Sequence, residues 1–200
     1  MAGLTGVFGG TFDPPHLGHL ILAEAARQAL GLDKVLWVVT AQPPHKPNGQ
    51  RTPVELRLAM VTAAITGTGT FEISRADVDR PPPHYAVDTL RHLAAELPDA
   101  RFAYLMGEDS LRDLPAWHTP QEFIQACDVI GVMERSGAEP DLTDLEGILP
   151  GLSARVRFFR APIIDIASHD LRRRVRSGES IRYLVPEGVE QIIRGQGLYR

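Results

Sequence analysis

The sequence predicts a doubly wound α/β fold, a mainly parallel sheet with helices on both faces and a small helical part at the C-terminus. Short apolar runs recur along the chain, and segments with apolar residues at helical spacing separate them. Strands and helices that alternate with short connections are typical of βαβ units, whose strands are parallel. Glycines follow several of the apolar runs, at the positions where such sheets bind ligands.

The first βαβ unit has the clearest pattern. Residues 4–8 form an apolar run that predicts a buried strand, and two glycines end it. Pro14 and Pro15 predict a helix start, because proline suits the first helical turn. Apolar residues at helical spacing follow, Gly31 is a typical C-terminal stop, and residues 35–39 predict the second strand.

The same alternation continues along the rest of the chain. Apolar runs predict further strands at 71–73, 102–106, 129–133 and 156–159. Helical spacing predicts helices at 54–65, 85–97, 120–126, 170–177 and 187–194. Proline-rich segments predict a loop at 41–53 and a surface connection at 79–83, whereas residues 136–150 show no clear pattern. We expect one Rossmann-like domain over residues 1–200, with about 165–200 as its C-terminal helical segment.

Composition excludes several classes of protein. The chain has 200 residues, 44% hydrophobic and 23% charged, which is typical of a globular domain. A net charge of -4 argues against nucleic acid as the main partner. No segment has the pattern of a membrane span or signal peptide, so we expect a cytoplasmic protein without a membrane partner. The single cysteine, Cys127, fits a reducing compartment and predicts a small buried side chain, and a homo-oligomer is left open.

The segment after the first strand carries the main chemical signal. Gly9 and Gly10 let the backbone approach a ligand closely, and the following helix N-terminus favours an anion. His16 and His19 are three residues apart and share a helix face. Two imidazoles beside backbone donors predict a site for phosphate oxygens that stabilises a leaving pyrophosphate. The glycine spacing fits neither G-x-G-x-x-G nor a Walker A loop, and further ligands at zinc-site spacing are missing.

The segment from Gly9 to His19 resembles the GGTFDPxHxGH signature of bacterial nicotinate mononucleotide adenylyltransferases, a family of the HxGH nucleotidyltransferases. The HxGH element marks only the superfamily, whereas the longer signature is much more specific. The resemblance implies transfer of AMP from ATP to nicotinate mononucleotide in NAD biosynthesis, with pyrophosphate as the second product. It implies direct attack by the mononucleotide phosphate, Mg²⁺ bound mainly through the ATP phosphates, and no metal ligands from the protein.

Further segments extend the resemblance along nearly the whole chain. Residues 43–46 are similar to the PPHK loop, 85–90 to Y-x-x-D-T-L, and 107–111 to G-x-D-S-L. The resemblance implies catalysis by His16 and His19, helped by Thr11, Ser168 and Arg172. It implies that ATP contacts the residues Gly9, Gly10, Thr11, Phe12, His16, His19, Gly107, Asp109, Arg135, Ser168 and Arg172. It implies that the mononucleotide contacts His45, Lys46, Tyr85, Asp88, Thr89 and Trp117, with Trp117 stacking on the pyridine ring.

Physical reasoning on single residues adds to these assignments. The helix start near Tyr85 prefers a carboxylate to a neutral amide, which favours nicotinate over nicotinamide. Asp109 is equally suited to accept from a ribose hydroxyl, to assist a metal ion or to cap a helix. Trp37 lies inside an apolar strand and predicts a core residue, and we expect Arg57 to be structural.

The poorest match lies at residues 166–172, which align with I-S-S-T-x-I-R. Ser168 and Arg172 are retained, whereas Ala167 replaces a serine and His169 a threonine, so we hypothesise that His169 donates to phosphate instead. In the basic run of this helix, we expect Arg172 alone to face phosphate. Other functions remain open: the same chemistry on nicotinamide mononucleotide or phosphopantetheine, or a non-catalytic nucleotide-binding protein. The altered loop favours the non-catalytic alternative, and the intact His16 and His19 argue against it.

Overall fold

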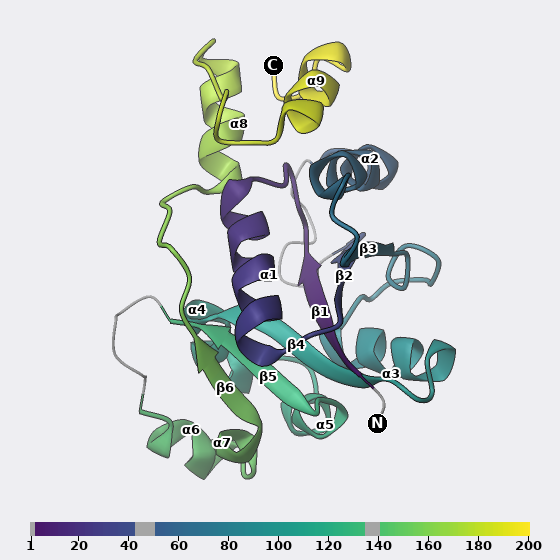
Figure 1. The fold of residues 1–200 in the computed structure, drawn as a ribbon, viewed down its shortest axis with the longest axis vertical. Helices are drawn as coiled ribbons and strands as arrows, with labels where there is room; N and C mark the ends of the chain where they lie inside the picture. The colour runs from purple at the N-terminus through teal and green to yellow at the C-terminus, as the bar shows by residue number, and fades with distance from the viewer. Residues whose placement is uncertain (1–2, 43–50, 135–140) are drawn as a thin grey trace.

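The computed structural model of the chain describes residues 3–42, 51–134 and 141–200. In these residues one parallel sheet has the order β3-β2-β1-β4-β5-β6 (Figure 1). Its strands are β1 (Leu4–Gly10), β2 (Lys34–Val39), β3 (Phe71–Ser74), β4 (Arg101–Gly107), β5 (Val129–Met133) and β6 (Val156–Phe159). The six strands predicted from apolar runs are therefore confirmed. Strands covered on both faces of a parallel sheet are rich in apolar residues, which is why the runs were visible in the sequence.

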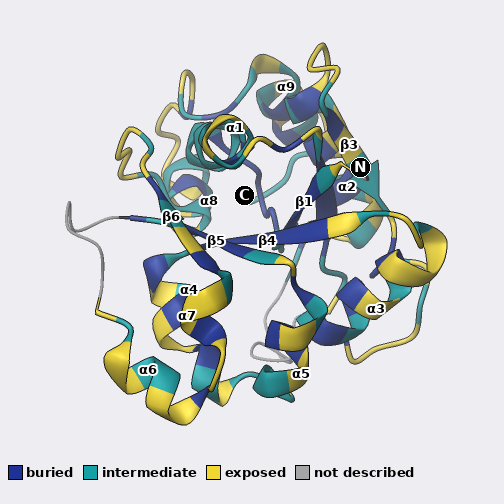
Figure 2. Cartoon of the chain, turned by 60° about the horizontal axis from the view of Figure 1, so that its bottom comes forward, coloured by how far each residue is buried: buried dark blue, intermediate teal, exposed yellow. Residues whose placement is uncertain are grey.

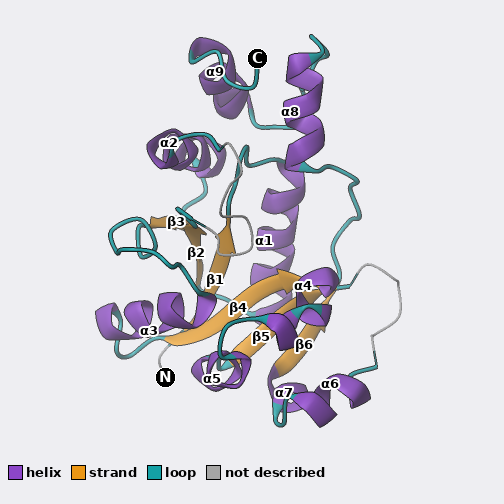
Figure 3. Ribbon diagram, turned by 180° about the vertical axis from the view of Figure 1, so that it is seen from behind, coloured by secondary structure: helices purple, strands orange, loops and turns teal. Residues whose placement is uncertain are grey.

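Helices cover both faces of this sheet, which confirms the doubly wound α/β class. The longer ones are α1 (Leu17–Leu30), α2 (Val54–Ile65), α3 (Ala86–Glu96), α8 (Ser168–Arg176) and α9 (Glu187–Gly195). The shorter ones are α4 (Glu108–Arg112), α5 (Pro120–Ala126), α6 (Thr143–Ile148), α7 (Leu152–Arg155) and the 3₁₀ helix η1 (Leu114–Ala116). Figure 1 shows α1 in front of the sheet, and the view from behind shows α3, α4 and α5 on the opposite face (Figure 3).

Two clusters of buried apolar residues lie on the two faces of the sheet, whose central strands are largely buried (Figure 2). On one face, Leu36 and Tyr104 of the sheet pack in the same cluster as buried residues of α3 and α5, including Cys127 just after α5. On the other face, Trp37 packs with buried residues of α1 and α2. Cys127 is 1% exposed and Trp37 is 0% exposed, so both are buried as predicted.

The C-terminal helices form a third cluster beside the sheet. Met60 of α2 contacts a group of buried residues from α8, α9 and the turn between them: Leu171, Ile181, Val185, Val189 and Ile193. Figure 1 shows α8 and α9 at one end of the molecule, above α1 and α2. This packing brings the end of the chain to the glycine-rich loop after β1.

The strand order reverses between β1 and β4, and this reversal positions the site. β1 pairs with β2 on one side and with β4 on the other, so the connections from these strands leave in opposite directions. A crevice therefore opens where the carboxyl ends of β1 and β4 meet. The loop after β1 contains the glycines and histidines that the sequence singled out.

The predicted start of the first helix is wrong. Helix α1 begins at Leu17, not at Pro14, and His16 is its extended N-cap residue. The physical reason is that Pro15 disfavours the helical conformation at the residue before it, so two consecutive prolines keep Pro14 out of the helix. The sequence also gave no prediction for α4, η1, α6 and α7, which are too short to show a helical period.

None of the helices in the described part of the chain is both long and apolar enough to cross a lipid bilayer.

Candidate active site

A cavity of about 370 Å³ lies at the carboxyl ends of β1, β2 and β4. The start of α3 and the segment around η1 complete its wall. Seven of the predicted site residues line it: Gly9, Gly10, Thr11, Tyr85, Thr89, Gly107 and Trp117. The crevice predicted from strand order therefore contains most of the predicted contacts from β1, α3 and β4.

The two histidines stack against each other at the start of α1. Their ring centroids are 3.7 Å apart with an angle of 29° between the planes. The backbone N–H of His16 donates to Nδ1 of His19 at 3.2 Å, so the proton of the neutral His19 ring is on Nε2. Nδ1 of His16 is buried and has no hydrogen-bond partner among the described residues. Because buried polar atoms are nearly always paired, this nitrogen indicates a place for a ligand group.

Burial keeps both imidazole rings neutral near pH 7. It lowers the pKa of His16 to about 4. Burial, and then the neighbouring His16, lowers the pKa of His19 well below its ordinary value. The pair therefore offers N–H donors rather than fixed charges, and a bound phosphate would favour protonation by supplying the opposite charge.

The lowered pKa of His16 predicts a loss of stability in acid. Below pH 6.5 the unfolded chain binds a proton at His16 that the folded chain does not bind until about pH 4. Neutral His16 therefore contributes about 3 kcal/mol to the free energy of unfolding above pH 6.5, and this contribution is lost as the pH falls toward 4. Urea unfolding at pH 7 and pH 4.5 should show a smaller fall in stability for His16→Asn than for the wild type, by roughly 2–3 kcal/mol. Equal falls in both proteins would contradict the burial of a neutral His16.

The loop that leads into His16 is held by the C-terminal part of the chain. Ser168 Oγ donates to the carbonyl of Pro14 at 2.9 Å, and Arg172 donates to the carbonyl of Asp13 at 2.7 Å. Tyr199 Oη donates to Asp13 Oδ1 at 2.6 Å. The predicted pair Ser168 and Arg172 thus lies beside the His16 loop, where it supports the loop directly.

Tyr199 was missed by the sequence analysis, because a tyrosine next to the end of a chain carries no local signal. His169 is exposed and forms an ion pair with Asp170 at 3.4 Å. Two other arginines of the basic run face acids: Arg173 pairs with Asp170 and Glu179, and Arg174 pairs with Glu179.

Arg57 joins the loops after β1 and β2. It is 1% exposed, and its guanidinium donates to four backbone carbonyls. The acceptors are Thr52 at 3.0 Å, Thr11 at 2.8 Å, Thr40 at 2.8 Å and Ala41 at 3.0 Å. This geometry confirms the expectation that Arg57 is structural, because one planar fork satisfies carbonyls from three segments.

Several predicted residues lie away from the cavity wall. Phe12 is 2% exposed and packs against Phe8, Trp37 and His19, so its ring belongs to the core.

Asp109 is exposed in the first turn of α4 and forms an ion pair with Arg112 at 3.5 Å. Gly107 is the N-cap of α4, so the alternative of Asp109 as N-cap is wrong. The predicted His45, Lys46 and Arg135 lie outside the described residues.

The start of α3 forms the opposite wall of the cavity. Tyr85 is the N-cap residue of α3 and makes no side-chain capping bond, and His118 stacks on its ring with centroids 4.0 Å apart. Trp117 lines the cavity beside it. The first N–H groups of a helix have no partner within the helix, so this wall is suited to an anion. Asp88 pairs with Arg91 at 3.1 Å and does not line the cavity, in contrast to its predicted role.

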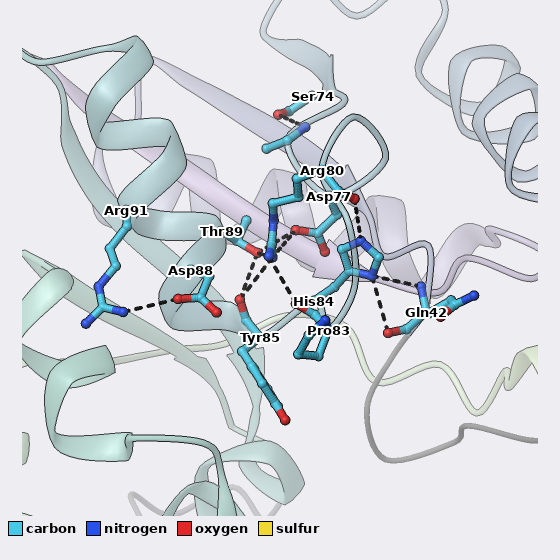
Figure 4. A network of polar contacts seen from close by, with 11 residues as sticks. Gln42, Ser74, Asp77, Arg80, Pro83, His84, Tyr85, Asp88, Thr89 and Arg91 are labelled. Atoms are coloured by element: carbon cyan, nitrogen blue, oxygen red, sulfur yellow. Dashed lines mark hydrogen bonds and ion pairs between the residues drawn. The ribbon is translucent and has the colours of Figure 1, made fainter.

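A buried polar network behind α3 was not found from the sequence (Figure 4). Asp77 accepts from Thr89 Oγ1 at 2.6 Å and pairs with Arg80 at 3.0 Å. His84 contacts the Arg80 carbonyl at 3.1 Å and accepts from the Gln42 N–H at 3.2 Å. Residues 79–83 were predicted as a surface connection. Pro81–Pro83 are exposed, but the Arg80 side chain turns inward and is 15% exposed. The sequence signal for this network was Asp77 and Arg80, an acid and a base three residues apart just before the Tyr85 motif.

Comparisons with known proteins agree with the fold and show the family. Residues 7–177 match the family model described as cytidylyltransferase-like. The chain is 48% identical over 195 residues to a Thermomicrobium roseum protein named "Probable nicotinate-nucleotide adenylyltransferase", covering 98% of this chain and 91% of that one. A Salinibacter ruber protein of the same name is 42% identical, with 98% and 97% covered.

Solved structures share the same architecture. The Plasmodium falciparum nicotinic acid mononucleotide adenylyltransferase complexed with NaAD has a TM-score of 0.78, at 17% identity, with 98% of this chain and 97% of that chain covered. A Vibrio parahaemolyticus protein described as a "Putative Nicotinate-nucleotide Adenylyltransferase" has a TM-score of 0.70 at 18% identity, with 100% of this chain and 96% of that chain covered. These likenesses show the fold, whereas the sequence relatives show the family. The chain belongs to the cytidylyltransferase-like proteins and, among them, to the nicotinate-nucleotide adenylyltransferases.

Proposed function

We propose that this enzyme transfers AMP from ATP to nicotinate mononucleotide, giving nicotinate adenine dinucleotide and pyrophosphate. One observation carries the proposal: the uncapped first turn of α3 lies in the cavity wall, and the loop of Gly9, Gly10 and Thr11 that lines the cavity leads on to the stacked His16–His19 pair at the start of α1. The α1 end suits the ATP phosphates, and the α3 end suits the carboxylate of the pyridine ring. The names of the relatives support the same reaction.

The chemistry needs no nucleophile from the protein. A phosphate oxygen of the mononucleotide attacks the α-phosphorus of ATP, and the bond from that phosphorus to the bridging oxygen breaks as pyrophosphate leaves. The protein contributes by positioning two anions and by donating hydrogen bonds to developing charge. Nε2–H of His19 and the unpaired nitrogen of His16 are the groups we assign to this donation. Thr11 lines the cavity.

Ser168 and Arg172 contribute through the loop as well as through charge. Both donate to carbonyls of the segment just before His16, so they set where the imidazole pair lies. We propose that Arg172, which is partly exposed, also faces the ATP phosphates. Its guanidinium has five donors, and one contact with Asp13 leaves others for an anion.

Nucleotidyltransferases of this family act on ATP together with a divalent metal ion, and we propose Mg²⁺. Within the described residues, no three His, Cys, Asp or Glu side chains come together as a metal site. Mg²⁺ usually keeps several waters and is held through substrate phosphates with few protein ligands, so a site on the ATP phosphates fits this donor set. When bound, the ion would neutralise charge on the pyrophosphate.

Pyrophosphate release tests the proposed function. The full chain with Mg-ATP should release pyrophosphate rapidly with nicotinate mononucleotide, more slowly with nicotinamide mononucleotide, and not with phosphopantetheine. A carboxylate at a helix N-terminus gains up to about 2 kcal/mol over a neutral group, so we expect a preference of up to about 30-fold in kcat/KM. Nucleotide binding without pyrophosphate release in the presence of any of these acceptors would favour a non-catalytic protein instead.

A further inference from the structure

The cavity wall that receives the pyridine mononucleotide contains a carboxylate of its own. Asp77 lines the cavity beside Thr89, Tyr85 and Trp117, and its side chain is 3% exposed. Burial raises the pKa of Tyr104, and the nearby Asp77 charge raises it further, so this charge acts on the cavity wall. An acidic group here opposes an acceptor that carries a carboxylate, unless another group offsets its charge.

Arg80 supplies that offset. Its side chain is 15% exposed, and one terminal nitrogen donates to Asp77 Oδ1 at 3.0 Å, to Thr89 Oγ1 at 3.1 Å and to the Tyr85 carbonyl at 3.3 Å. The other terminal nitrogen donates to the Pro83 carbonyl at 3.1 Å. Figure 4 shows the guanidinium between Asp77 and the start of α3. The cation therefore fixes the N-cap residue of α3 and neutralises the acid with the same contacts.

Thr89 is occupied by this network rather than free for the ligand. Its hydroxyl has one proton, which the 2.6 Å contact directs to Asp77, and its oxygen accepts from Arg80. The first N–H groups of α3 are left as donors for a carboxylate on this side of the cavity. The Asp77–Arg80 pair contacts the residue that starts this helix, through the bond from Arg80 to the Tyr85 carbonyl.

We propose that the Asp77–Arg80 ion pair determines acceptor specificity, because charge compensation by Arg80 allows the cavity to accept a mononucleotide whose ring carries a carboxylate. The inference rests on the proposed function and extends it to two positioning residues that act through Thr89 and the start of α3. Two like charges about 6 Å apart, at an effective dielectric constant of about 20, weaken binding roughly 100-fold. A neutral acceptor does not experience this repulsion.

The test compares kcat, KM and Kd for the two mononucleotides in matched variants. Arg80→Gln should lower kcat/KM for nicotinate mononucleotide by roughly 10- to 100-fold, mainly through KM, with a far smaller change for nicotinamide mononucleotide. Asp77→Asn should raise the ratio of kcat/KM for nicotinate mononucleotide to kcat/KM for nicotinamide mononucleotide, whereas Arg80→Gln lowers it. The double variant Asp77→Asn with Arg80→Gln should return this ratio toward the wild-type value. Arg80→Lys, which keeps the charge, should retain the nicotinate preference.

Arg91→Gln is the matched control. Arg91 forms an Asp–Arg pair of the same spacing on the exposed side of α3, away from the cavity (Figure 4). It should leave the acceptor ratio unchanged.

Two results would overturn the inference. Equal losses of kcat/KM for both acceptors in Arg80→Gln would mean that the ion pair is purely structural. A double variant with the same ratio of the two kcat/KM values as Arg80→Gln alone would exclude charge compensation. Because removing one partner of a buried pair destabilises strongly, thermal melts accompany each variant. If Arg80→Gln does not fold, the opposite shift in Asp77→Asn decides the question. Failure of the wild type to use nicotinate mononucleotide would instead refute the proposed function, and this inference with it.

Discussion

Replacing His19 with asparagine is expected to lower kcat by roughly 10²–10³, with a small change in KM for the mononucleotide. The asparagine side chain keeps an oxygen near the position of Nδ1, which accepts the His16 backbone N–H at 3.2 Å in the wild type. The substitution therefore removes Nε2–H while retaining the local hydrogen bond. Loss of one donor to developing charge in a transition state has this magnitude. Steady-state pyrophosphate release at saturating Mg-ATP measures it.

His92→Asn is the control for this substitution. His92 is on α3, is partly exposed and forms an ion pair with Glu96 at 3.3 Å. It should retain wild-type kcat, because His92 neither lines the cavity nor contacts the stacked His16–His19 pair. A loss smaller than about threefold in His19→Asn would remove His19 from the catalytic machinery. The double variant of His16 and His19 is expected to lose less than the product of the single losses, because the stacked rings act as a unit.

Replacing Arg57 with methionine is expected to lower the free energy of unfolding by at least about 3 kcal/mol. Methionine fills much of the same buried volume, but the four carbonyls of Thr52, Thr11, Thr40 and Ala41 lose their donor. Each buried, unpaired acceptor costs about 1–3 kcal/mol, and water entry into the loops recovers part of this. The melting temperature, followed by circular dichroism, should fall by roughly 6–12 °C.

Two further variants sharpen this result. Arg57→Lys should recover only part of the stability, because a single ammonium cannot reach carbonyls from three segments at once. Arg75→Met should leave the melting temperature nearly unchanged, since Arg75 is exposed and pairs with Glu55 and Asp79 at the surface. A stable Arg57→Met protein would mean that the loops after β1 and β2 are held by other contacts.

The sequence predicted all six strands and the starts of α2, α5 and α9, but it placed the start of α1 too early. The central strands β1, β2, β4 and β5 are mostly buried on both faces, so their apolar runs are visible without knowledge of the fold. The start of α1 depends on a local competition that the pattern does not show, in which Pro15 restricts Pro14. The short α4 gave no signal, because five residues do not complete two helical turns.

The site likewise contains residues that the sequence predicted and contacts that it did not. Gly9, Gly10 and Thr11 line the cavity as predicted, because strand order alone places the end of β1 at the crevice. Contacts between distant segments were not predictable, such as the bond from Tyr199 to Asp13, 186 residues apart. The inward turn of Arg80 was hidden by its proline-rich surroundings, which usually mark a surface loop.

Competition between the two acceptors tests the central claim most directly. The enzyme is given Mg-ATP with equal concentrations of nicotinate mononucleotide and nicotinamide mononucleotide, and chromatography quantifies the two dinucleotides. The helix N-terminus of α3 and the compensated Asp77 charge predict that nicotinate adenine dinucleotide predominates by about tenfold or more, with one pyrophosphate per dinucleotide. Equal amounts, an excess of the nicotinamide product, or ATP consumed without either dinucleotide would contradict the assignment.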